Sequence, residues 1–480
     1  MSTIPSTLNV ADTIKAGLPA PDHPPIESTG SSLLNLENAG ALQMGFWVPN
    51  RVYASANYLI PLRNQVRQLR SGSDGVQLHP AVAEFKDWIT SNSAIRMGVN
   101  MMIEQSNMFV CYVEMVRPDL KDVIIMEDGD NLAIEHFDAF FETISMIIQT
   151  SPSFNATAQV GTPLNGFLAV PMGTVAGTAL FHDASFNAQF KKVLDAWNAF
   201  LKSPASLDKL DINDPEKPGS WISKQAQDAG VWTDMVYDAS KPAYGFASWN
   251  DFFIRQFQPG VRPFTGDAAV SVNIGCETTP WAYANDVAFE SNFWVKDVDY
   301  SLLDLFGGRA DVAQMFVGGQ IYQGFLSATH YHRWTAPLDG QLVSSWVEPG
   351  TYFAQRPGQG EVIGTWDGTE SQPFLGHVAA RAIFVFNHER CGLVAMICIG
   401  MVEVSTCVIE PAYLVPAGQQ PVQITRGTEI GHFEFGGSTH MLVFQKDKVQ
   451  LESWALKASD HSDLNQKPTP MGTVIATAIA

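Results

Sequence analysis

The chain is poor in cysteine, and no two cysteines form a Cys-x-x-Cys pair. The five cysteines are scattered through 480 residues, at Cys111, Cys276, Cys391, Cys398 and Cys407. Disulfide-rich secreted domains and structural zinc sites carry cysteines at short, regular spacings. The sequence therefore predicts neither a disulfide framework nor a cysteine-based zinc site, and it favours a reducing compartment.

Positive charge is also scarce. The chain has 29 basic residues against 49 acidic ones, which gives a formal net charge of −20. Nucleic acids and anionic membrane surfaces attract proteins with a basic excess. The charge balance therefore argues against a nucleic-acid partner and against binding to an anionic lipid surface.

Long uninterrupted apolar runs are missing as well. The start of the chain has neither the apolar block of a signal peptide nor an arginine-rich transit sequence. The most apolar window, Gly392 to Glu410, contains Glu403, Ser405 and Thr406 and is rich in β-branched residues. It is typical of two buried strands rather than of a membrane span. We expect a cytoplasmic protein without stable membrane insertion.

What the sequence does have is helical periodicity in its first half. Residues 1–44 are rich in Ser, Pro, Gly and Ala and predict a flexible tail. Between 45 and 202, apolar residues recur at helical spacing, which predicts a mainly helical N-terminal domain. The two clearest stripes are Phe137, Phe140, Phe141, Ile144 and Ile148, then Phe190, Leu194, Trp197 and Leu201.

The second half changes character. Residues 203–240 are rich in Pro and Asp and are expected to form a linker or long loop. "SWNDFFIRQF" then predicts a short helix, capped by Ser248 and Asp251. From about residue 270 the pattern is one of short strands separated by turn residues. The chain is therefore predicted to have an α+β fold, with a mostly β domain over residues 241–480.

Two glycines, a serine and a threonine stand together in "FEFGGSTHMLVF", at Gly436 to Thr439. One interpretation is a hairpin turn, since paired glycines between apolar residues are common there. The other is self-cleavage. A serine hydroxyl can attack the preceding carbonyl to form an ester, and elimination and hydrolysis then leave a pyruvoyl group. A glycine before the serine tolerates the strained backbone that this attack requires.

His330 and His332 lie two residues apart in "GFLSATHYHRW", in a segment that we expect to be a strand, so their side chains would share a face. Three interpretations remain. The spacing matches the beginning of a cupin-type metal motif, but the glutamate and the second histidine block are missing. Either histidine could be structural. A histidine acting as acid or base is chemically suitable, because its pKa is near neutrality.

Several motifs in a fixed order resemble the phosphatidylserine decarboxylase family. They are "WNDFFIRQFQPGVRPF", "GFLSATHYHRWTAPLDG", "VEPGTYFA", "GTEIGHFEFGGST" and "MLVF". The resemblance covers roughly residues 245 to 455. The helical first half resembles an extra domain of fungal members. "YGFASWNDFFIRQF", "QGFLSATHYHRW" and "IGMVEVSTC" are especially similar to a fungal branch that decarboxylates free tryptophan.

The resemblance implies a proenzyme that cleaves itself between Gly437 and Ser438. A large β chain would end at Gly437, and a small α chain would begin with a pyruvoyl group made from Ser438. The substrate amine would form a Schiff base with this group, which takes the place of pyridoxal phosphate as the electron sink for loss of CO₂. No metal is implied. A homodimer of cleaved protomers is one arrangement that the sequence permits.

The chain departs from the family pattern at three places. One glycine is added before Ser438. The family's Tyr-His-Arg-x-His keeps its first histidine as His332, but Thr335 stands in place of the second. The family's activating aspartate corresponds to Glu277. The resemblance thus implies Ser438, His332 and Glu277 as catalytic residues. The base that activates Ser438 is left open between His332, His330 and His440.

The absence of a membrane span and the net charge of −20 favour a free amino acid over a lipid as substrate. The aromatic preference follows from the resemblance alone. Two alternatives remain at this point: a phosphatidylserine decarboxylase of phospholipid synthesis, and an uncleaved family member that is non-catalytic or binds a metal.

Overall fold

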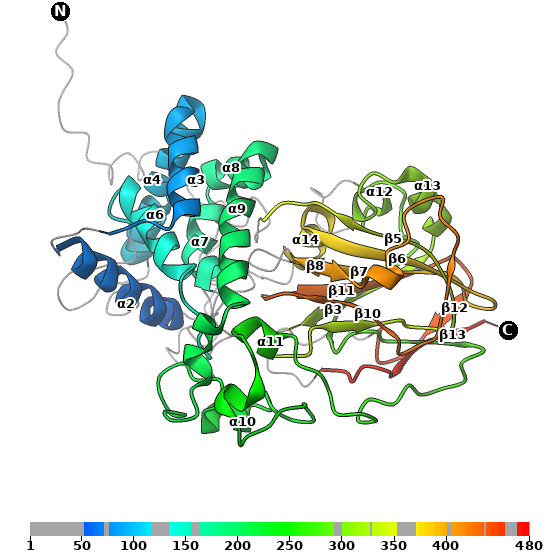
Figure 1. The fold of residues 1–480 in the computed structure, drawn as a ribbon. Helices are drawn as coiled ribbons and strands as arrows, with labels where there is room; N and C mark the ends of the chain where they lie inside the picture. Colours follow the sequence, from blue (N-terminus) through cyan, green and yellow to red (C-terminus); the bar gives the residue numbers. More distant parts are fainter. Residues whose placement is uncertain are drawn as a thin grey trace, which may run out of the picture.

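The computed structural model consists of a helical part and a β part that lie side by side (Figure 1). It describes residues 52–71, 76–116, 134–154, 163–291, 300–326, 329–352, 371–400, 406–435, 438–456 and 468–479. The tail expected over residues 1–44 lies outside these ranges. An N-terminal group of helices followed by antiparallel sheets confirms the predicted α+β class.

The N-terminal helices form the first layer of the molecule. They are α2 (Val52–Ser71), α3 (Pro80–Ser91), α4 (Ser93–Val116), α6 (Phe137–Ile147), α7 (Pro163–Gly173), α8 (Val175–His182) and α9 (Ala184–Leu201). The two predicted apolar stripes lie on α6 and α9, where Phe140, Phe141, Phe190 and Trp197 are buried. Both helix predictions are therefore confirmed. None of the described helices is long and apolar enough to cross a membrane.

A compact, irregular segment follows α9. It contains η4 (Pro204–Leu210), α10 (Lys224–Asp228), η5 (Pro242–Gly245) and α11 (Trp249–Phe253). Residues 203–240, expected to be a linker or long loop, bury Trp221 and Trp232. The cap predicted for α11 is present, because the Ser248 hydroxyl accepts a hydrogen bond from the backbone N–H of Asp251 at 3.1 Å.

The β part is built on a seven-stranded antiparallel sheet with the order β2-β3-β11-β7-β6-β5-β9. Two three-stranded sheets, β1-β13-β12 and β4-β10-β8, complete it. The strands are β1 (Ser271–Asn273), β2 (Thr279–Asn285), β3 (Gln320–Leu326), β4 (Arg333–Thr335), β5 (Gly340–Glu348), β6 (Arg381–His388), β7 (Gly392–Gly400), β8 (Cys407–Ile409), β9 (Val422–Ile424), β10 (Glu429–Phe433), β11 (Ser438–Phe444), β12 (Val449–Leu451) and β13 (Val474–Ala478).

Short helices border this sheet, namely α12 (Leu302–Leu305), α13 (Ala310–Ala313), η6 (Gln314–Phe316), α14 (Ser371–Val378) and η8 (Pro411–Tyr413). The window from Gly392 to Glu410 contains β7 and β8, which confirms the prediction of two strands, while residues 401–405 lie outside the described ranges.

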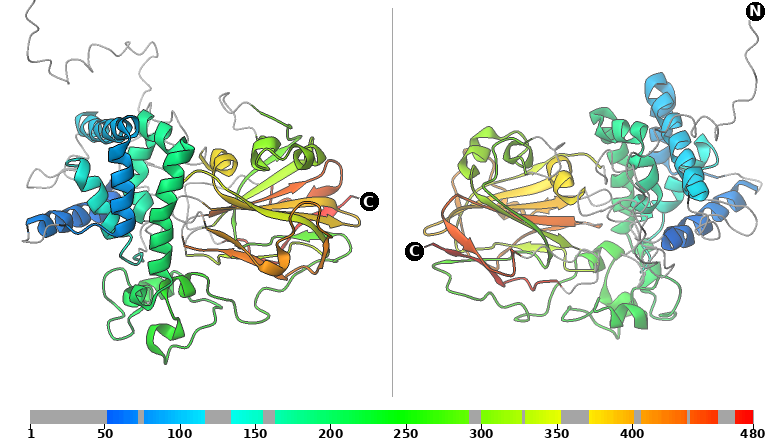
Figure 2. Two further views of the ribbon diagram at one scale, coloured as in Figure 1. Left: turned by 45° about the horizontal axis from the view of Figure 1, so that its top comes forward. Right: turned by 180° about the vertical axis from the view of Figure 1, so that it is seen from behind.

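The central strand β11 is buried along its whole length, from Ser438 to Phe444. One of its faces shares a core with the helical part, and the other packs against the two smaller sheets. All three views place the helical part against one end of the large sheet (Figure 2). That end is where β11 begins, so the residue at its start lies near the junction of the two parts.

Candidate active site

Ser438 is the first residue of β11 and is completely buried. It lies opposite Leu326 of β3 and Gly400 of β7. Gly436 and Gly437 lie outside the described residues. The hairpin interpretation of this segment is wrong, because β10 before it and β11 after it belong to different sheets. The chain therefore ends a strand of one sheet at Phe433 and begins a strand of another at Ser438.

The Ser438 hydroxyl has no hydrogen-bond partner among the described residues. A buried polar group without a partner costs free energy, so such groups need an explanation in terms of function or of a partner not yet in place. An unpaired serine oxygen at the start of a rigid central strand is suited to act as a nucleophile once a base takes its proton.

His440 lies two residues further along the same strand, so its side chain is on the same face as that of Ser438. Their Cα atoms are about 7 Å apart by strand geometry. His440 is fully buried, and neither ring nitrogen has a hydrogen-bond partner within the described ranges. Burial lowers the pKa of His440 to about 3. The imidazole is therefore neutral at pH 7 and able to accept a proton.

His332 lies in the connection between β3 and β4, just before Arg333. The prediction that His330 and His332 share a strand is wrong, because β3 ends at Leu326 and β4 begins only at Arg333. The His332 ring is buried and stacks on Phe253 of α11, with 3.9 Å between ring centroids. Burial, followed by the charge of Arg255, holds the pKa of His332 well below its usual value.

The buried Arg255 ties this connection to the end of α11. Its guanidinium donates to the backbone carbonyls of Val231 at 3.1 Å and Thr329 at 2.7 Å. Burial lowers the pKa of Arg255 to about 10. Burial lowers the pKa of the partly exposed His330 to about 4, and the charge of Arg255 adds to this effect. Both histidines of the motif are therefore neutral at pH 7.

The polar contacts of Glu277 are made with residues other than these histidines. Its buried carboxylate pairs with Arg262, which also bonds Asp234 at 2.9 Å. Burial raises the pKa of Glu277, while the hydrogen bond and the charge of Arg262 oppose that rise. No hydrogen bond joins the Glu277 carboxylate to the described parts of His332 or Ser438.

Thr335 stands where the resemblance would place a second histidine. It is buried, and its hydroxyl donates to the carbonyl of Gly275 at 3.2 Å. A threonine hydroxyl used in this way cannot serve as a base near pH 7. The role of the second histidine must therefore be absent or belong to another residue.

Thr439 belongs to a second group of polar side chains, on the face of β11 opposite to Ser438 and His440. Its hydroxyl donates to the carbonyl of Gly324 at 2.9 Å and accepts from the Gln323 amide at 3.2 Å. The Tyr300 hydroxyl donates to the Gln323 amide oxygen at 2.6 Å. This chain of bonds fixes the strand on that face.

The structure brings Ser438 and His440 onto one strand face and places His332 in the connection that leads to β4, while Glu277 has its own arginine partner. Sequence reasoning missed Phe253 and Arg255 as neighbours of the histidines, although both stand in the "FFIR" motif. It also missed Gln323 and Tyr300, for which the sequence carries no local signal. Across the described ranges, no group of three or more His, Cys, Asp or Glu side chains is arranged to hold a metal ion.

Comparison with known proteins identifies the family. Two family models described as phosphatidylserine decarboxylase match residues 79–229 and residues 249–468. The decarboxylase iboD of Amanita muscaria is 36% identical over 304 residues, which cover 59% of this chain and 84% of that protein. The L-tryptophan decarboxylase of Psilocybe cubensis is 30% identical over 378 residues, covering 74% of this chain and 83% of the relative.

Bacterial relatives match only about half of the chain. The phosphatidylserine decarboxylase proenzyme of Shewanella pealeana is 29% identical over 244 residues, covering 48% of this chain and 79% of its own length. The fungal relatives extend over more of the chain than the bacterial ones do. By these matches and by its fold, the chain belongs to the phosphatidylserine decarboxylase family, to which its fungal relatives also belong, and it is a decarboxylase.

Proposed function

We propose that this chain cleaves itself between Gly437 and Ser438 and then acts as a pyruvoyl-dependent decarboxylase of a free aromatic L-amino acid, such as tryptophan. The observation that carries the proposal is the buried Ser438 hydroxyl, which has no partner within the described residues and has a neutral, equally unpartnered imidazole two residues away on the same strand face.

The cleavage chemistry balances with the groups that the chain supplies. The Ser438 oxygen attacks the carbonyl carbon of Gly437 and forms a C–O bond, while the hydroxyl proton passes to a base. The bond from that carbon to the Ser438 nitrogen then breaks as the nitrogen gains a proton, which converts the amide to an ester. A base then removes the Cα proton of Ser438, and the Cα–Cβ double bond forms as the carboxylate of Gly437 leaves. Water replaces the nitrogen of the resulting dehydroalanine, and ammonia is released.

His440 is the base that best fits the activation of Ser438. It lies on the same face of β11, it is neutral because burial lowers its pKa to about 3, and its nitrogens are unpaired in the described structure. A histidine acts as a general base only in its unprotonated form and within reach of the proton, and the geometry before reaction is often looser than that during reaction. His440 would thus replace the histidine that Thr335 does not provide.

The residues around Ser438 fit a pyruvoyl group at this position, because the unpaired buried polar atoms there lie in an otherwise apolar environment. Once formed, that group supplies an electron sink for the carbanion that remains when CO₂ leaves. His332 is suited to move a proton at the substrate Cα, since its buried ring is neutral and held flat against Phe253. The surrounding apolar side chains exclude water, which favours protonation by a fixed group.

A free amino acid is supported as substrate by the relatives and by charge. The relatives named L-tryptophan decarboxylase align with 70% or more of the chain, whereas the bacterial phosphatidylserine decarboxylase proenzymes align with about half. A net charge of −20 disfavours approach to an anionic lipid surface. The aromatic preference rests on likeness to these relatives.

The test is a panel of substrates offered to the full-length protein. Tryptophan, tyrosine, phenylalanine and phosphatidylserine vesicles are each incubated with the protein, and CO₂ release is measured, with the Ser438→Ala variant as control. We expect release from an aromatic amino acid and none from the variant. Release from the vesicles alone would replace this substrate with phosphatidylserine, and equal activity of the variant would exclude a pyruvoyl group made from Ser438.

A further inference from the structure

We propose that helix α9 of the N-terminal part holds the residues just before the cleavage site and so positions the scissile peptide for self-cleavage. The inference rests on the proposed function and assigns the helical part a role in the maturation of the active site. Glu434 and Phe435, which precede the two glycines, are the residues that the helix holds.

The first contact is electrostatic. The Glu434 carboxylate is 6% exposed, and it accepts a hydrogen bond from the Asn198 amide at 2.7 Å and pairs with the Lys202 ammonium at 2.6 Å. Asn198 and Lys202 are four residues apart, so they project from the same side at the end of α9. A buried carboxylate loses its hydration and depends on such partners, so the helix fixes the position of Glu434.

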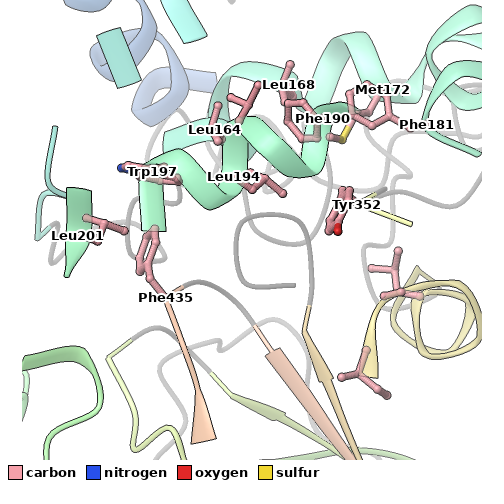
Figure 3. Packing of buried hydrophobic residues seen from close by; sticks show 14 of the residues in the cluster. Leu164, Leu168, Met172, Phe181, Phe190, Leu194, Trp197, Leu201, Tyr352 and Phe435 are labelled. Atoms are coloured by element: carbon pink, nitrogen blue, oxygen red, sulfur yellow. The ribbon is translucent and has the colours of Figure 1, made fainter. Parts of the chain in front are cut away.

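The second contact is aromatic. The Phe435 ring lies edge-on to Trp197 of α9, at 5.2 Å between centroids, and to Trp249 of α11, at 4.5 Å. Figure 3 shows Phe435 reaching from the end of the β part towards Trp197 on the helix. The Trp197 ring is itself fixed, because its N–H donates to the carbonyl of Thr150 at 3.0 Å. Aromatic pairs of this kind stabilise a contact beyond the area that they bury.

The packing around Phe435 extends to His332, the candidate catalytic histidine. Phe253 of α11 packs against Phe435 at 5.4 Å and stacks on His332 at 3.9 Å. One ring therefore touches both the residue held by the helices and the imidazole of the site. The position of Phe435 is thus tied to that of His332 through a single side chain.

The physical reason for such an anchor lies in the two glycines. Glycine has the greatest backbone freedom of any residue, so a peptide that follows two glycines in the sequence gains most from fixed residues on either side. Ser438 is fixed on one side by the pairing of β11 with β3 and β7. Holding Phe435 places a second fixed residue shortly before Ser438, and a reaction within one chain accelerates when its reacting groups are prepositioned.

The experiment follows chain splitting with time after synthesis of the full-length protein in a cell-free system. Lys202→Met removes the charge and keeps the apolar stem, and Phe435→Leu removes the aromatic ring. The matched control is Lys191→Met, on the same helix, whose partner Asp195 is exposed. We expect Lys202→Met to slow splitting about tenfold, Phe435→Leu to slow it more, and Lys191→Met to leave it unchanged.

Two further measurements separate positioning from a loss of folding. The double variant Lys202→Glu with Glu434→Lys restores the pair with its charges exchanged, and it should recover most of the splitting rate. Melting temperatures are measured in an uncleavable Ser438→Ala background, where Lys202→Met should lie within a few degrees of its parent. Slow splitting without recovery in the double variant, or splitting that slows only in proportion to a lower melting temperature, would overturn the anchor.

The result distinguishes this inference from the proposed function. If the wild-type chain splits at Ser438 and the Lys202 and Phe435 variants split equally fast, the anchor is wrong while self-cleavage stands. If the wild-type chain never splits, the proposed function fails, and the anchor fails with it.

Discussion

The polar side chains on the two faces of strand β11 differ in their hydrogen bonding. On one face the Thr439 hydroxyl makes two hydrogen bonds, within a chain that continues to Gln323 and Tyr300. On the other face Ser438 and His440, buried just as fully, have no side-chain partners among the described residues. A single strand therefore carries both a satisfied and an unsatisfied polar face.

Most structural polar groups in a core are paired, because an unpaired one costs about 1–3 kcal/mol. The Thr439 face follows this rule and holds the strand in place. The Ser438 face violates it twice within three residues, on the strand that the whole sheet immobilises. We propose from this contrast that the first face serves stability and the second serves chemistry, and each of the following predictions tests that division.

The largest effect is expected from His440→Leu, which removes the imidazole and keeps an apolar side chain of similar size. If His440 is the base for Ser438, self-cleavage should slow by about 100-fold or more, the usual contribution of a general base. Splitting is measured by gel electrophoresis after synthesis. The control is His388→Leu, at the opposite end of the sheet, where the buried imidazole accepts from the backbone N–H groups of Arg390 and Cys391; this variant should lose stability but split at the normal rate. Fast splitting of His440→Leu together with an inert His332→Leu would instead assign the base to His332.

Acid should destabilise the folded protein through its buried histidines, among them His440 on the unsatisfied face. An unfolded histidine has a pKa near 6.5, whereas burial lowers that of folded His440 to about 3 and that of His332 well below 6.5. Below pH 6.5 the unfolded chain therefore binds protons that the folded chain does not, and stability falls as the pH falls. Between pH 7 and pH 5 the loss that His440 contributes should reach about 2 kcal/mol, and His332 should add to it in the same direction.

This loss is measured by urea unfolding of the uncleavable Ser438→Ala protein at several pH values. Adding the His440→Leu substitution to this protein should remove the part of the pH dependence that His440 contributes. An unchanged pH dependence would mean that His440 is protonated or partnered in the folded protein, and it would rule out a neutral, unpaired imidazole at this position.

A smaller effect, on stability alone, is expected from Thr439→Val. Valine matches threonine in shape but leaves the Gln323 amide and the Gly324 carbonyl without a hydroxyl partner, which should lower the free energy of unfolding by about 1–3 kcal/mol. Self-cleavage should continue at a similar rate. A large loss of cleavage with normal stability would show that both faces take part in the chemistry.

The sequence was informative where local patterns determine structure. The apolar stripes predicted α6 and α9, the pair Ser248 and Asp251 predicted the start of α11, and the β-branched run from Gly392 predicted buried strands. These features depend on spacing within one segment. The motif order also identified the family, which the comparisons confirm.

Other features depend on contacts between distant segments, which spacing alone does not reveal. The paired glycines before Ser438 resemble a hairpin turn, yet β10 and β11 enter different sheets. No strand covers His330 and His332, and the carbonyl of Thr329 in that connection accepts a hydrogen bond from the distant Arg255 instead. The hold of α9 on Glu434 joins residues more than 200 positions apart, and nothing in the sequence near either residue indicates it.

Self-cleavage would make Ser438 the start of a new chain, and every catalytic role proposed for the site depends on that step. The most direct measurement is the intact mass of the purified protein under denaturing conditions, before and after treatment with a carbonyl-trapping reagent. We expect two chains in place of one of 52.5 kDa, with the smaller chain beginning at position 438 and gaining the mass of one reagent molecule. A single unmodified chain of full mass would contradict self-cleavage and the pyruvoyl group together.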